Sequence, residues 1–395
     1  MKNLPKVSII IPTYNRAKYL TKAIESALMQ DYPNLEVIIS DDNSTDETPE
    51  IVKKYFNDSR FKYFRNDENI GAVRNLRKSV FEYSTGDWFM ILNDDDYLID
   101  NSYVSKALKL ASKDKDITLI YANGYILHEG KGILEKLELP FKEVEYGKKI
   151  FLTFHRGIVK PIDFTFCNVI FRKDLAKDVN AFSNEYNLGS DAELLLKSFL
   201  LGKAGIIKDI VSVYRIHNSN ISNMSLTKDF LLGYFDAFIG PYVFAKENNL
   251  LTEEELIFWF NETMLPVFIH AMIRTKDMKD LILSSINSKL NFNKIAIYGA
   301  GALGLSFYEN YLDNLSNKVC CFLDDEPKGR EIIGKPIIRL QDAPKDIELI
   351  IISPIALSSY RKMKSKVYDK DVIWLRDIIF PALKSLIDID SIMRA

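Results

Sequence analysis

Aspartates gather at two places in the first hundred residues of this 395-residue chain, each directly after a run of apolar residues. Asp41 and Asp42 follow the first run, and Asp94, Asp95 and Asp96 follow the second. Clustered carboxylates repel one another, and beside apolar strands they are costly unless a cation offsets their charge. Mg²⁺ or Mn²⁺ meets that need and completes its coordination shell with substrate phosphates. The pattern therefore predicts a site that holds a diphosphate through a metal.

The elements that must position these aspartates alternate between strand and helix. Runs of β-branched and apolar residues predict four strands, at 7–11, 35–39, 61–64 and 88–92. This order predicts a mostly parallel sheet with helices on both faces. Because ligands bind outside the carboxyl ends of such strands, the polar clusters at 12–15, 41–46 and 93–96 are expected in one cleft. Asp46 also suits a helix cap, and that alternative stays open.

The pattern is less regular up to about residue 220. Strands are predicted at 117–121, 166–171 and 206–215, and a helix is predicted at 191–201. The stretch 124–157 is predicted to be a loop-rich insertion.

The remainder of the chain divides in two. Apolar and aromatic residues at helical spacing predict a helical segment at 225–290. Its aromatic residues have two interpretations, the packing faces of helices or a patch that faces a membrane or a partner, and packing is the simpler one. From 291 to 395 strand and helix patterns alternate again. We therefore expect three parts, 1–224, 225–290 and 291–395.

Charge and composition exclude several classes of protein. A net charge of −2 gives no electrostatic footprint for nucleic acid, and 47% hydrophobic residues is ordinary for a globular protein. Cys167, Cys320 and Cys321 contain no C-x-x-C pair, so a reducing, cytoplasmic setting is expected. No apolar run approaches the roughly 18–20 residues of a spanning helix, and the run at 7–12 is too short for a signal peptide. Peripheral membrane contact and homodimerisation stay open.

Three segments resemble a known family: VSIIIPTYN at 7–15, IISDDNSTD at 38–46 and LNDDD at 92–96. Their order and spacing are similar to those of the family 2 glycosyltransferases. The resemblance implies a GT-A fold over 1–224, an α/β architecture in which a nucleotide-sugar-binding mixed sheet is flanked by helices. It also implies transfer with inversion at the sugar.

The resemblance assigns residues to the nucleotide. In the family the turn after the first strand lies beside the base, which implies contacts from Pro12 and Tyr14. Asp42 matches the aspartate that accepts a hydrogen bond from the base, most often uracil. Asp94 is implied at the ribose. Arg74, in a segment that resembles the family's Asn-x-Gly and Arg-Asn pattern, is implied at the ribose or phosphates, and an ordinary helix-surface position is its alternative.

The resemblance also assigns the metal, Mn²⁺ or Mg²⁺. The family's Asp-x-Asp motif matches Asn93, Asp94 and Asp95, with Asn at the first position. Asp95 is implied as a metal ligand, and Asp96 is expected to orient the loop. His217 ends a Tyr-Arg-x-His segment similar to the one that closes the family's catalytic domain, which implies a place near the metal or diphosphate. A structural role is the alternative for a lone histidine.

An inverting transfer needs a carboxylate that deprotonates the acceptor hydroxyl. The family places this base in a Glu-Asp pair that opens a helix, and Asp191 matches it, although Ser190 stands where the family has Glu. The alternative is that Asp191 only favours the helix N-terminus through its charge. Glu193 is the next choice for the base. Asn168 is predicted to border the acceptor pocket.

A second motif lies in the part 291–395. Gly299, Gly301 and Gly304 fit G-x-G-x-x-G between a predicted strand and helix, the context of a phosphate site. Asp324, at the end of the next strand, suits ribose hydroxyls. The segment resembles the small Rossmann-like domains attached to sugar-modifying acyltransferases and methyltransferases. We therefore expect a binding or scaffolding domain, and whether it retains a second nucleotide site stays open.

The leading hypothesis is a metal-dependent inverting glycosyltransferase. It moves a sugar from a nucleotide diphosphate donor, UDP-linked by this reasoning, to a glycan or lipid-linked acceptor in bacterial surface polysaccharide synthesis, such as capsule or lipopolysaccharide. The expected location is the cytoplasm or the inner face of the membrane. Two alternatives stay open: a nucleotide-sugar oxidoreductase or epimerase centred on 291–395, and a non-catalytic nucleotide-sugar-binding protein.

Overall fold

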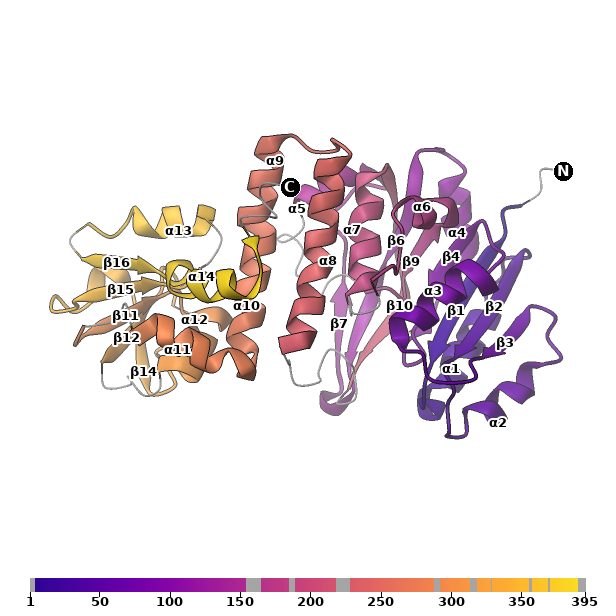
Figure 1. Ribbon diagram of the computed structural model, residues 1–395, viewed down its shortest axis with the longest axis horizontal. Helices are drawn as coiled ribbons and strands as arrows, with labels where there is room; N and C mark the ends of the chain where they lie inside the picture. The colour runs from indigo at the N-terminus through magenta and orange to yellow at the C-terminus, as the bar shows by residue number, and fades with distance from the viewer. Residues whose placement is uncertain are drawn as a thin grey trace. The chain divides into compact units, whose positions relative to one another are not determined.

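The computed structural model describes residues 4–153, 165–184, 189–217, 228–287, 292–312, 318–327, 329–354, 357–368 and 370–389. These residues belong to two compact units, drawn in Figure 1. The first combines Met1–Met224 with Asp236–Leu250, and the second combines Ser225–Phe235 with Leu251–Ala395. Helix α8 (Lys228–Glu247) contributes to both units. The segment 225–290, which the sequence predicted as one part, is therefore divided between them.

Within the described residues the first unit is built on a ten-stranded mixed sheet. Its main path runs in the order β3 (Phe61–Arg65), β2 (Leu35–Asp41), β1 (Val7–Thr13), β4 (Trp88–Ile91), β9 (Val169–Arg172), β6 (Ile117–His128), β10 (Lys203–Ile216) and β5 (Tyr97–Leu98). Strand β7 (Ile133–Leu137) pairs with β6, and β8 (Val144–Tyr146) pairs with β10. The first four strands are parallel, as predicted, and β9 runs antiparallel between β4 and β6.

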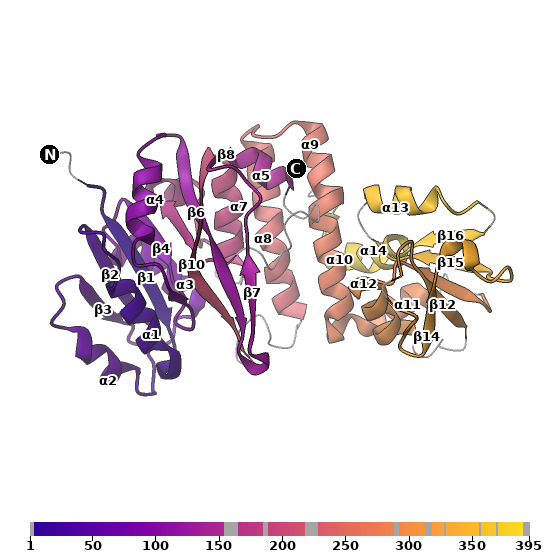
Figure 2. The same cartoon turned by 180° about the vertical axis from the view of Figure 1, so that it is seen from behind.

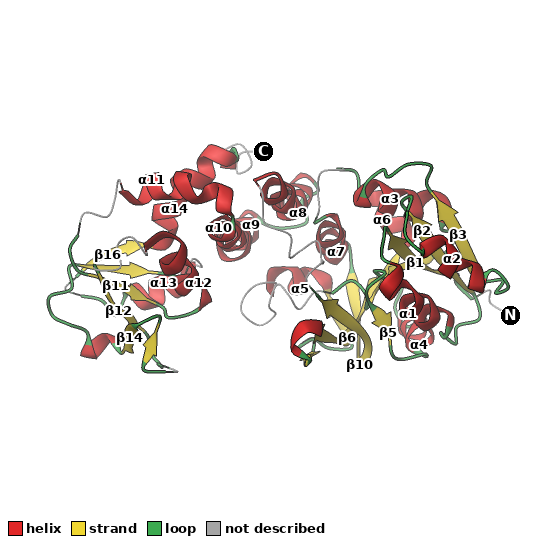
Figure 3. Cartoon of the chain, turned by 90° about the horizontal axis from the view of Figure 1, so that it is seen from below, coloured by secondary structure: helices red, strands yellow, loops and turns green. Residues whose placement is uncertain are grey.

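Helices cover both faces of this sheet. They are α1 (Ala17–Leu28), α2 (Thr48–Val52), α3 (Ala72–Lys78), α4 (Tyr103–Ala111), α5 (Gly147–Thr153), α6 (Lys173–Asp178) and α7 (Ser190–Leu200). Helices α1 and α4 lie on one face, and α3 and α6 lie on the other (Figure 3). Helix α1 has apolar residues at helical spacing on its buried side, where Leu20, Ala23 and Ile24 pack against alternate residues of β1. This packing fixes the position of α1 against β1.

The stretch 124–157 differs from the prediction of a loop-rich insertion. Strand β6 continues to His128, turns through Gly130 and Gly132, and pairs antiparallel with β7 (Figure 2). Strand β8 and helix α5 follow. The hairpin escaped sequence reasoning because four of the five β7 residues are exposed, which leaves no apolar alternation to read.

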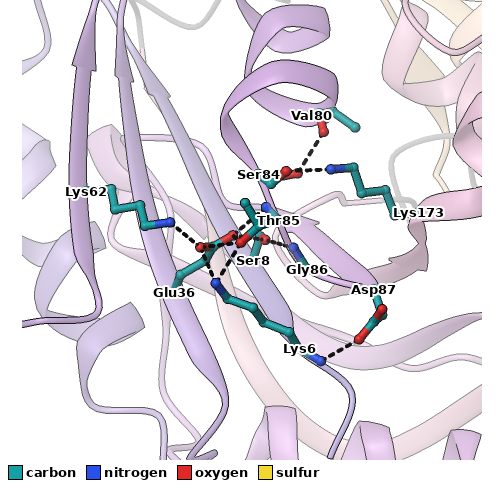
Figure 4. Close-up of polar contacts among 10 residues, drawn as sticks. All are labelled: Lys6, Ser8, Glu36, Lys62, Val80, Ser84, Thr85, Gly86, Asp87 and Lys173. Atoms are coloured by element: carbon teal, nitrogen blue, oxygen red, sulfur yellow. Dashed lines mark hydrogen bonds and ion pairs between the residues drawn. The ribbon is translucent and has the colours of Figure 1, made fainter.

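A buried ion-pair network stabilises the start of β1 and β2, at the end of these strands opposite the aspartate clusters (Figure 4). Glu36 is only 2% exposed, and Lys6 and Lys62 each place Nζ 2.7 Å from its carboxylate. Ser8 Oγ donates to Glu36 Oε1 at 2.6 Å and accepts from the Gly86 N–H at 2.9 Å. Burial alone raises the pKa of Glu36, but these donors lower it to about 2. The group is therefore ionised at neutral pH and crosslinks three segments of the chain.

The second unit carries, in its described residues, a six-stranded sheet. The order is β13 (Glu331–Ile332), β14 (Lys335–Ile338), β12 (Val319–Leu323), β11 (Ile295–Tyr298), β15 (Leu349–Ile352) and β16 (Asp371–Trp374). The five neighbouring strands β14, β12, β11, β15 and β16 are mutually parallel. The helices are α9 (Glu253–Trp259), α10 (Leu265–Arg274), α11 (Lys279–Asn287), α12 (Ala302–Phe307), α13 (Leu357–Lys364) and α14 (Leu375–Leu386). The predicted return of the α/β pattern after residue 291 is confirmed.

One continuous helical stretch in the described residues, Glu253–Ile273, is long and apolar enough to cross a membrane by length and composition alone. Its most apolar window has a mean hydropathy of 1.4, and 56% of that window is buried inside the protein. Core helices of soluble proteins have the same features, so the stretch does not by itself indicate a membrane span.

Candidate functional site

The carboxyl ends of β1, β2 and β4 bring the predicted polar clusters together. These strands are parallel neighbours, and hydrogen bonds continue past their ends. The Asp42 N–H donates to the Thr13 carbonyl at 2.9 Å, and the Leu92 N–H donates to the Ile10 carbonyl at 2.9 Å. The three motifs therefore share one edge of the sheet, as the topology predicts.

Two asparagines with left-handed backbones shape the turns at this edge, Asn15 with φ of 54° and Asn43 with φ of 67°. Asn15 Oδ1 accepts from the Thr45 N–H at 2.7 Å, and its own N–H donates to Ser44 Oγ at 2.9 Å. These two hydrogen bonds fix the positions of the two turns relative to each other. Beside them Pro12 is half-buried, and Tyr14 is 45% exposed and leaves its ring open to a ligand.

The Asp42 carboxylate organises the loop that leads to α3. It is 3% exposed and accepts from Asn66 Nδ2, the Ile70 N–H and the Gly71 N–H, each at 2.9 Å. Among these contacts of the described residues, Oδ2 accepts only the Gly71 bond, and a carboxylate oxygen can accept two. Arg74 follows on α3 and is exposed. Asp42 thus has a structural role whether or not it meets a base.

Two other aspartates of the segment 38–46, Asp41 and Asp46, accept hydrogen bonds from nearby residues of the chain. Asp41 is fully buried and accepts from the Tyr63 hydroxyl at 2.7 Å and from the Ser44 N–H at 2.8 Å. Asp46 accepts from the Ala17 N–H at 2.9 Å and the Thr48 N–H at 3.1 Å, so it serves the starts of both α1 and α2. Asp46 thus has a structural role of the kind that the capping alternative implies, although the N-cap residues of the two helices are Arg16 and Glu47.

Asp94, Asp95 and Asp96 are all buried, so three neighbouring carboxyl groups share a region with little access to water. Burial and the neighbouring Asp95 carboxylate raise the pKa of Asp94 to about 7, and the same causes raise that of Asp96 well above its usual range. Asp96 accepts from the Arg215 N–H at 2.8 Å and from Asn93 Nδ2 at 3.3 Å, which ties the loop to β10. A bound cation would remove the repulsion within this group.

The structure brings Asp95 and His217 together from positions 122 residues apart. His217 Nε2 lies 3.0 Å from Asp95 Oδ2, and Arg16 Nη1 lies 3.5 Å from the same oxygen. In the described part of the chain, no group of three or more His, Cys, Asp or Glu side chains is arranged to hold a metal. The metal ligands that the chain offers here are the Asp95 carboxylate oxygen and the His217 imidazole nitrogen, which lie next to each other. This donor pair fits Mn²⁺ or Mg²⁺ if phosphates and water complete the shell.

Arg215 connects this pair to the β6–β7 hairpin. Its Nε donates to the Asp95 carbonyl at 2.9 Å, and its Nη1 lies 3.2 Å from Glu129 Oε1. The guanidinium lies 4.9 Å from the ring centre of Tyr19, on which His217 stacks at 4.8 Å. The Tyr19 hydroxyl in turn donates to Glu129 at 2.9 Å. These contacts fix the metal-motif loop and the orientation of the imidazole.

Asp191 opens α7, in the first turn of the helix, as predicted. Its Oδ1 accepts from the Ala192 N–H at 2.7 Å, and burial raises its pKa to about 6. A carboxyl with that pKa is poised to exchange a proton near neutral pH. Glu193, the next choice, pairs with Lys197 at 2.5 Å. The prediction that Asn168 borders an acceptor pocket is wrong, because the side chain is fully buried and its amide bonds to Thr165 and the Ala122 carbonyl.

The glycine motif of the second unit follows β11. Gly299 has φ of 106°, which suits glycine, and a Cβ on Gly304 would lie 2.4 Å from the Gly299 carbonyl oxygen. Gly301 precedes the six-residue α12 and has open space around it. Asp324 directly follows β12 and accepts from the Glu326 N–H at 2.9 Å. The close strand–helix packing of the motif is present.

Comparison with known proteins supports the resemblance of the first unit. The model of the family described as Glycosyl transferase family 2 matches residues 8–179. The Campylobacter jejuni GalNAc(5)-diNAcBac-PP-undecaprenol beta-1,3-glucosyltransferase is 32% identical over 248 residues, which cover 59% of this chain and 73% of the relative. The Escherichia coli putative colanic acid biosynthesis glycosyl transferase WcaA is 30% identical over 242 residues, which cover 60% of this chain and 81% of the relative. The chain belongs to glycosyltransferase family 2.

Solved structures agree with the fold of this glycosyltransferase. The crystal structure of Staphylococcus aureus TarS 1–349 matches with a TM-score of 0.51 at 20% identity, covering 71% of this chain and 84% of that one. The predicted GT-A architecture is therefore confirmed. Both relatives are named as glycosyltransferases of bacteria, and the E. coli protein is named for colanic acid biosynthesis.

Sequence reasoning missed three side chains in the site of this glycosyltransferase: Arg16, Tyr19 and Glu129. Arg16 directly follows the turn at 12–15, so its position was a signal. Glu129 carried no signal, since its place depends on a hairpin that the sequence did not reveal.

Proposed function

We propose that this glycosyltransferase is a metal-dependent, inverting enzyme that uses a UDP-linked donor and a glycan or lipid-linked acceptor. The observation that carries the proposal is the contact between Asp95 and His217 inside a buried acidic group. Two facts about similar proteins support the choice of substrates. TarS, 21% identical with a TM-score of 0.50, has been crystallised with UDP-GlcNAc, and the C. jejuni relative is named for an undecaprenol-linked acceptor.

In the proposed mechanism one set of the chain's residues binds the nucleotide. Pro12 and Tyr14 flank the base, while Asp42 Oδ2 accepts a hydrogen bond from it. Asp94 and Arg74 hold the ribose and the phosphates.

Asp95 and His217 would hold Mn²⁺ or Mg²⁺, which when bound stabilises the negative charge of the leaving diphosphate. Arg215 keeps the Asp95 backbone in place through its 2.9 Å bond to the carbonyl. Asp191 takes the proton from the acceptor hydroxyl as the hydroxyl attacks the anomeric carbon from the face opposite the diphosphate.

For the chain as a whole we propose a catalytic domain over 1–224, a helical segment over 225–290 whose residues are shared between the two compact units, and a Rossmann-like domain over 291–395. The tight approach of Gly304 to Gly299 favours a nucleotide or nucleotide-sugar as the ligand of the last domain, with Gly301 and Asp324 beside it. A lipid-linked acceptor would require work at the inner face of the membrane, so we propose peripheral contact there. We also propose a second copy of the chain as a partner, in a homodimer.

A thermal-shift panel tests these assignments. UDP, GDP, dTDP, CMP and NAD(P) are each added with and without Mn²⁺, because a ligand that binds the native state raises the melting temperature by mass action. The expected result is a Mn²⁺-dependent rise with UDP in the wild type and none in Asp95→Ala. A rise with NAD(P) alone would refute the donor assignment and favour an oxidoreductase or epimerase centred on the second unit.

A further inference from the structure

Strand β12 carries two adjacent cysteines whose side chains lie together. Cys320 Sγ is 3.5 Å from Cys321 Sγ. In a regular strand successive side chains point to opposite faces of the sheet. Here Ile295 pairs with Val319 and Ala296 pairs with Cys321, so Cys320 is the extra residue of a β-bulge. The bulge accounts for the proximity of the two thiols.

The two thiols differ in their surroundings. Cys320 is half-buried and Cys321 is 1% exposed. The hydrogen bond from Cys321, and the Lys294 ammonium beyond it, lower the pKa of Cys320 to about 7, although burial and Asp346 oppose them. The same hydrogen bond raises the pKa of Cys321. Cys320 therefore has the character of a nucleophile and Cys321 that of its protonated partner.

The backbone around the bulge is held from one side only. Strand β12 pairs with β11 from Val319 to Leu323, whereas its pairing with β14 involves Phe322 and Leu323. The segment that contains Cys320 and Cys321 thus has a free side within the described sheet, which lets the peptide between them adjust. A disulfide requires the sulfurs to move from 3.5 Å to about 2.05 Å.

We propose that Cys320 and Cys321 form an oxidation-sensitive dithiol that a peroxide converts to a vicinal disulfide. The Cys320 thiolate attacks one peroxide oxygen and becomes a sulfenic acid, releasing hydroxide when the peroxide is hydrogen peroxide. Cys321 sulfur then attacks the Cys320 sulfur, and the thiol proton and the sulfenic hydroxyl leave together as water. The net change is the loss of one hydrogen atom from each cysteine, with the peroxide reduced to water. This inference is independent of the proposed sugar transfer.

Intact-mass and peptide mapping of the full chain after treatment with hydrogen peroxide tests the proposal. Wild type and Cys167→Ser are expected to lose two hydrogen atoms and to give one peptide with a 320–321 disulfide. Cys321→Ser is expected to stop at a sulfenic acid on Cys320, which dimedone traps. Cys167 is fully buried with a raised pKa, so it serves as the internal unreactive thiol.

Two results would overturn the proposal. One is a wild-type protein that keeps both thiols free while Cys167 reacts equally fast. The other is a wild-type protein and a Cys321→Ser variant that give the same Cys320 product. Phenylarsine oxide, which needs two neighbouring thiols, gives a second readout on the untreated wild type. Failure of phenylarsine oxide to bind would count against the dithiol itself.

Discussion

Replacing Asp191 by asparagine is expected to remove the proton acceptor while leaving the helix start intact. The carbonyl of the new amide can still accept from the Ala192 N–H, which now donates to Asp191 Oδ1 at 2.7 Å. A positioned general base contributes about 10²–10⁴-fold to rate, which corresponds to roughly 3–5 kcal/mol of barrier. Asp191→Asn is therefore expected to lower kcat by that factor with unchanged donor affinity. Its melting temperature at pH 7 is expected to be no lower than that of the wild type, because the burial that raises the pKa of Asp191 penalises the charged form.

The raised pKa of Asp191 adds a pH dependence to this prediction. The base works when deprotonated, so with a pKa of about 6 activity is lost as the pH falls through 6. Between pH 7 and pH 5 the ionised fraction falls roughly tenfold, and kcat/KM is expected to fall with it. Saturating Mn²⁺ keeps the Asp94 group ionised, because a cation lowers the pKa of nearby carboxyls. Asp191 is then the carboxyl that titrates near 6.

The assay is the initial rate of UDP release from a UDP-sugar with acceptor across pH 5–8. Glu193→Gln is the matched control, since Glu193 lies on the same helix turn and pairs with Lys197. This control is expected to keep a near-wild-type rate and the same pH profile. If Asp191→Asn kept both the wild-type rate and the fall in kcat/KM near pH 6, Asp191 would not be the base. A large loss of rate in Glu193→Gln would then assign the base to Glu193.

Three further predictions concern the metal pair, the hairpin and the buried network. Asp95→Ala is expected to abolish Mn²⁺-dependent UDP binding in calorimetry, and equal affinity with and without Mn²⁺ in the wild type would contradict the metal assignment. Glu129→Gln is expected to weaken the hold on Arg215 and raise the Mn²⁺ concentration for half-maximal activity several-fold, whereas Glu135→Gln, on the same hairpin, is expected to have no such effect. Glu36→Gln is expected to lower the free energy of unfolding at pH 7 by roughly 2–3 kcal/mol, since its pKa falls from 4.5 to about 2 on folding. That stability is present above pH 4.5 and is lost as the pH falls toward 2, so denaturant melts of the two proteins should converge there.

The parallel half of the sheet was predictable because its strands are buried on both faces. Val7–Thr13 and Leu35–Asp41 are almost wholly buried, and each contains a run of β-branched residues, Ile9–Ile11 and Val37–Ile39, that indicates a buried strand directly. The polar turns at their ends then follow from topology alone. For the same reason the glycine motif after Ile295–Tyr298 was found in its correct context.

The rest of the site depends on contacts that no local pattern records. Glu129 meets Arg215 across 86 residues, and its hairpin strand β7 is mostly exposed. Asn168 has the polar character expected of a ligand contact, yet the fold uses its amide internally. A polar residue in a sequence does not show whether its partner is a ligand or the backbone.

The central claim is metal-dependent transfer from a UDP-sugar at the Asp95 and His217 pair. The most direct test is UDP release by the full chain from a panel of UDP-sugars with a lipid-linked acceptor, with Mn²⁺, with EDTA and with Mn²⁺ restored. We expect turnover with at least one donor that EDTA abolishes and Mn²⁺ recovers, and none with Asp95→Ala. Turnover that is the same in EDTA, or that survives in Asp95→Ala, would contradict it.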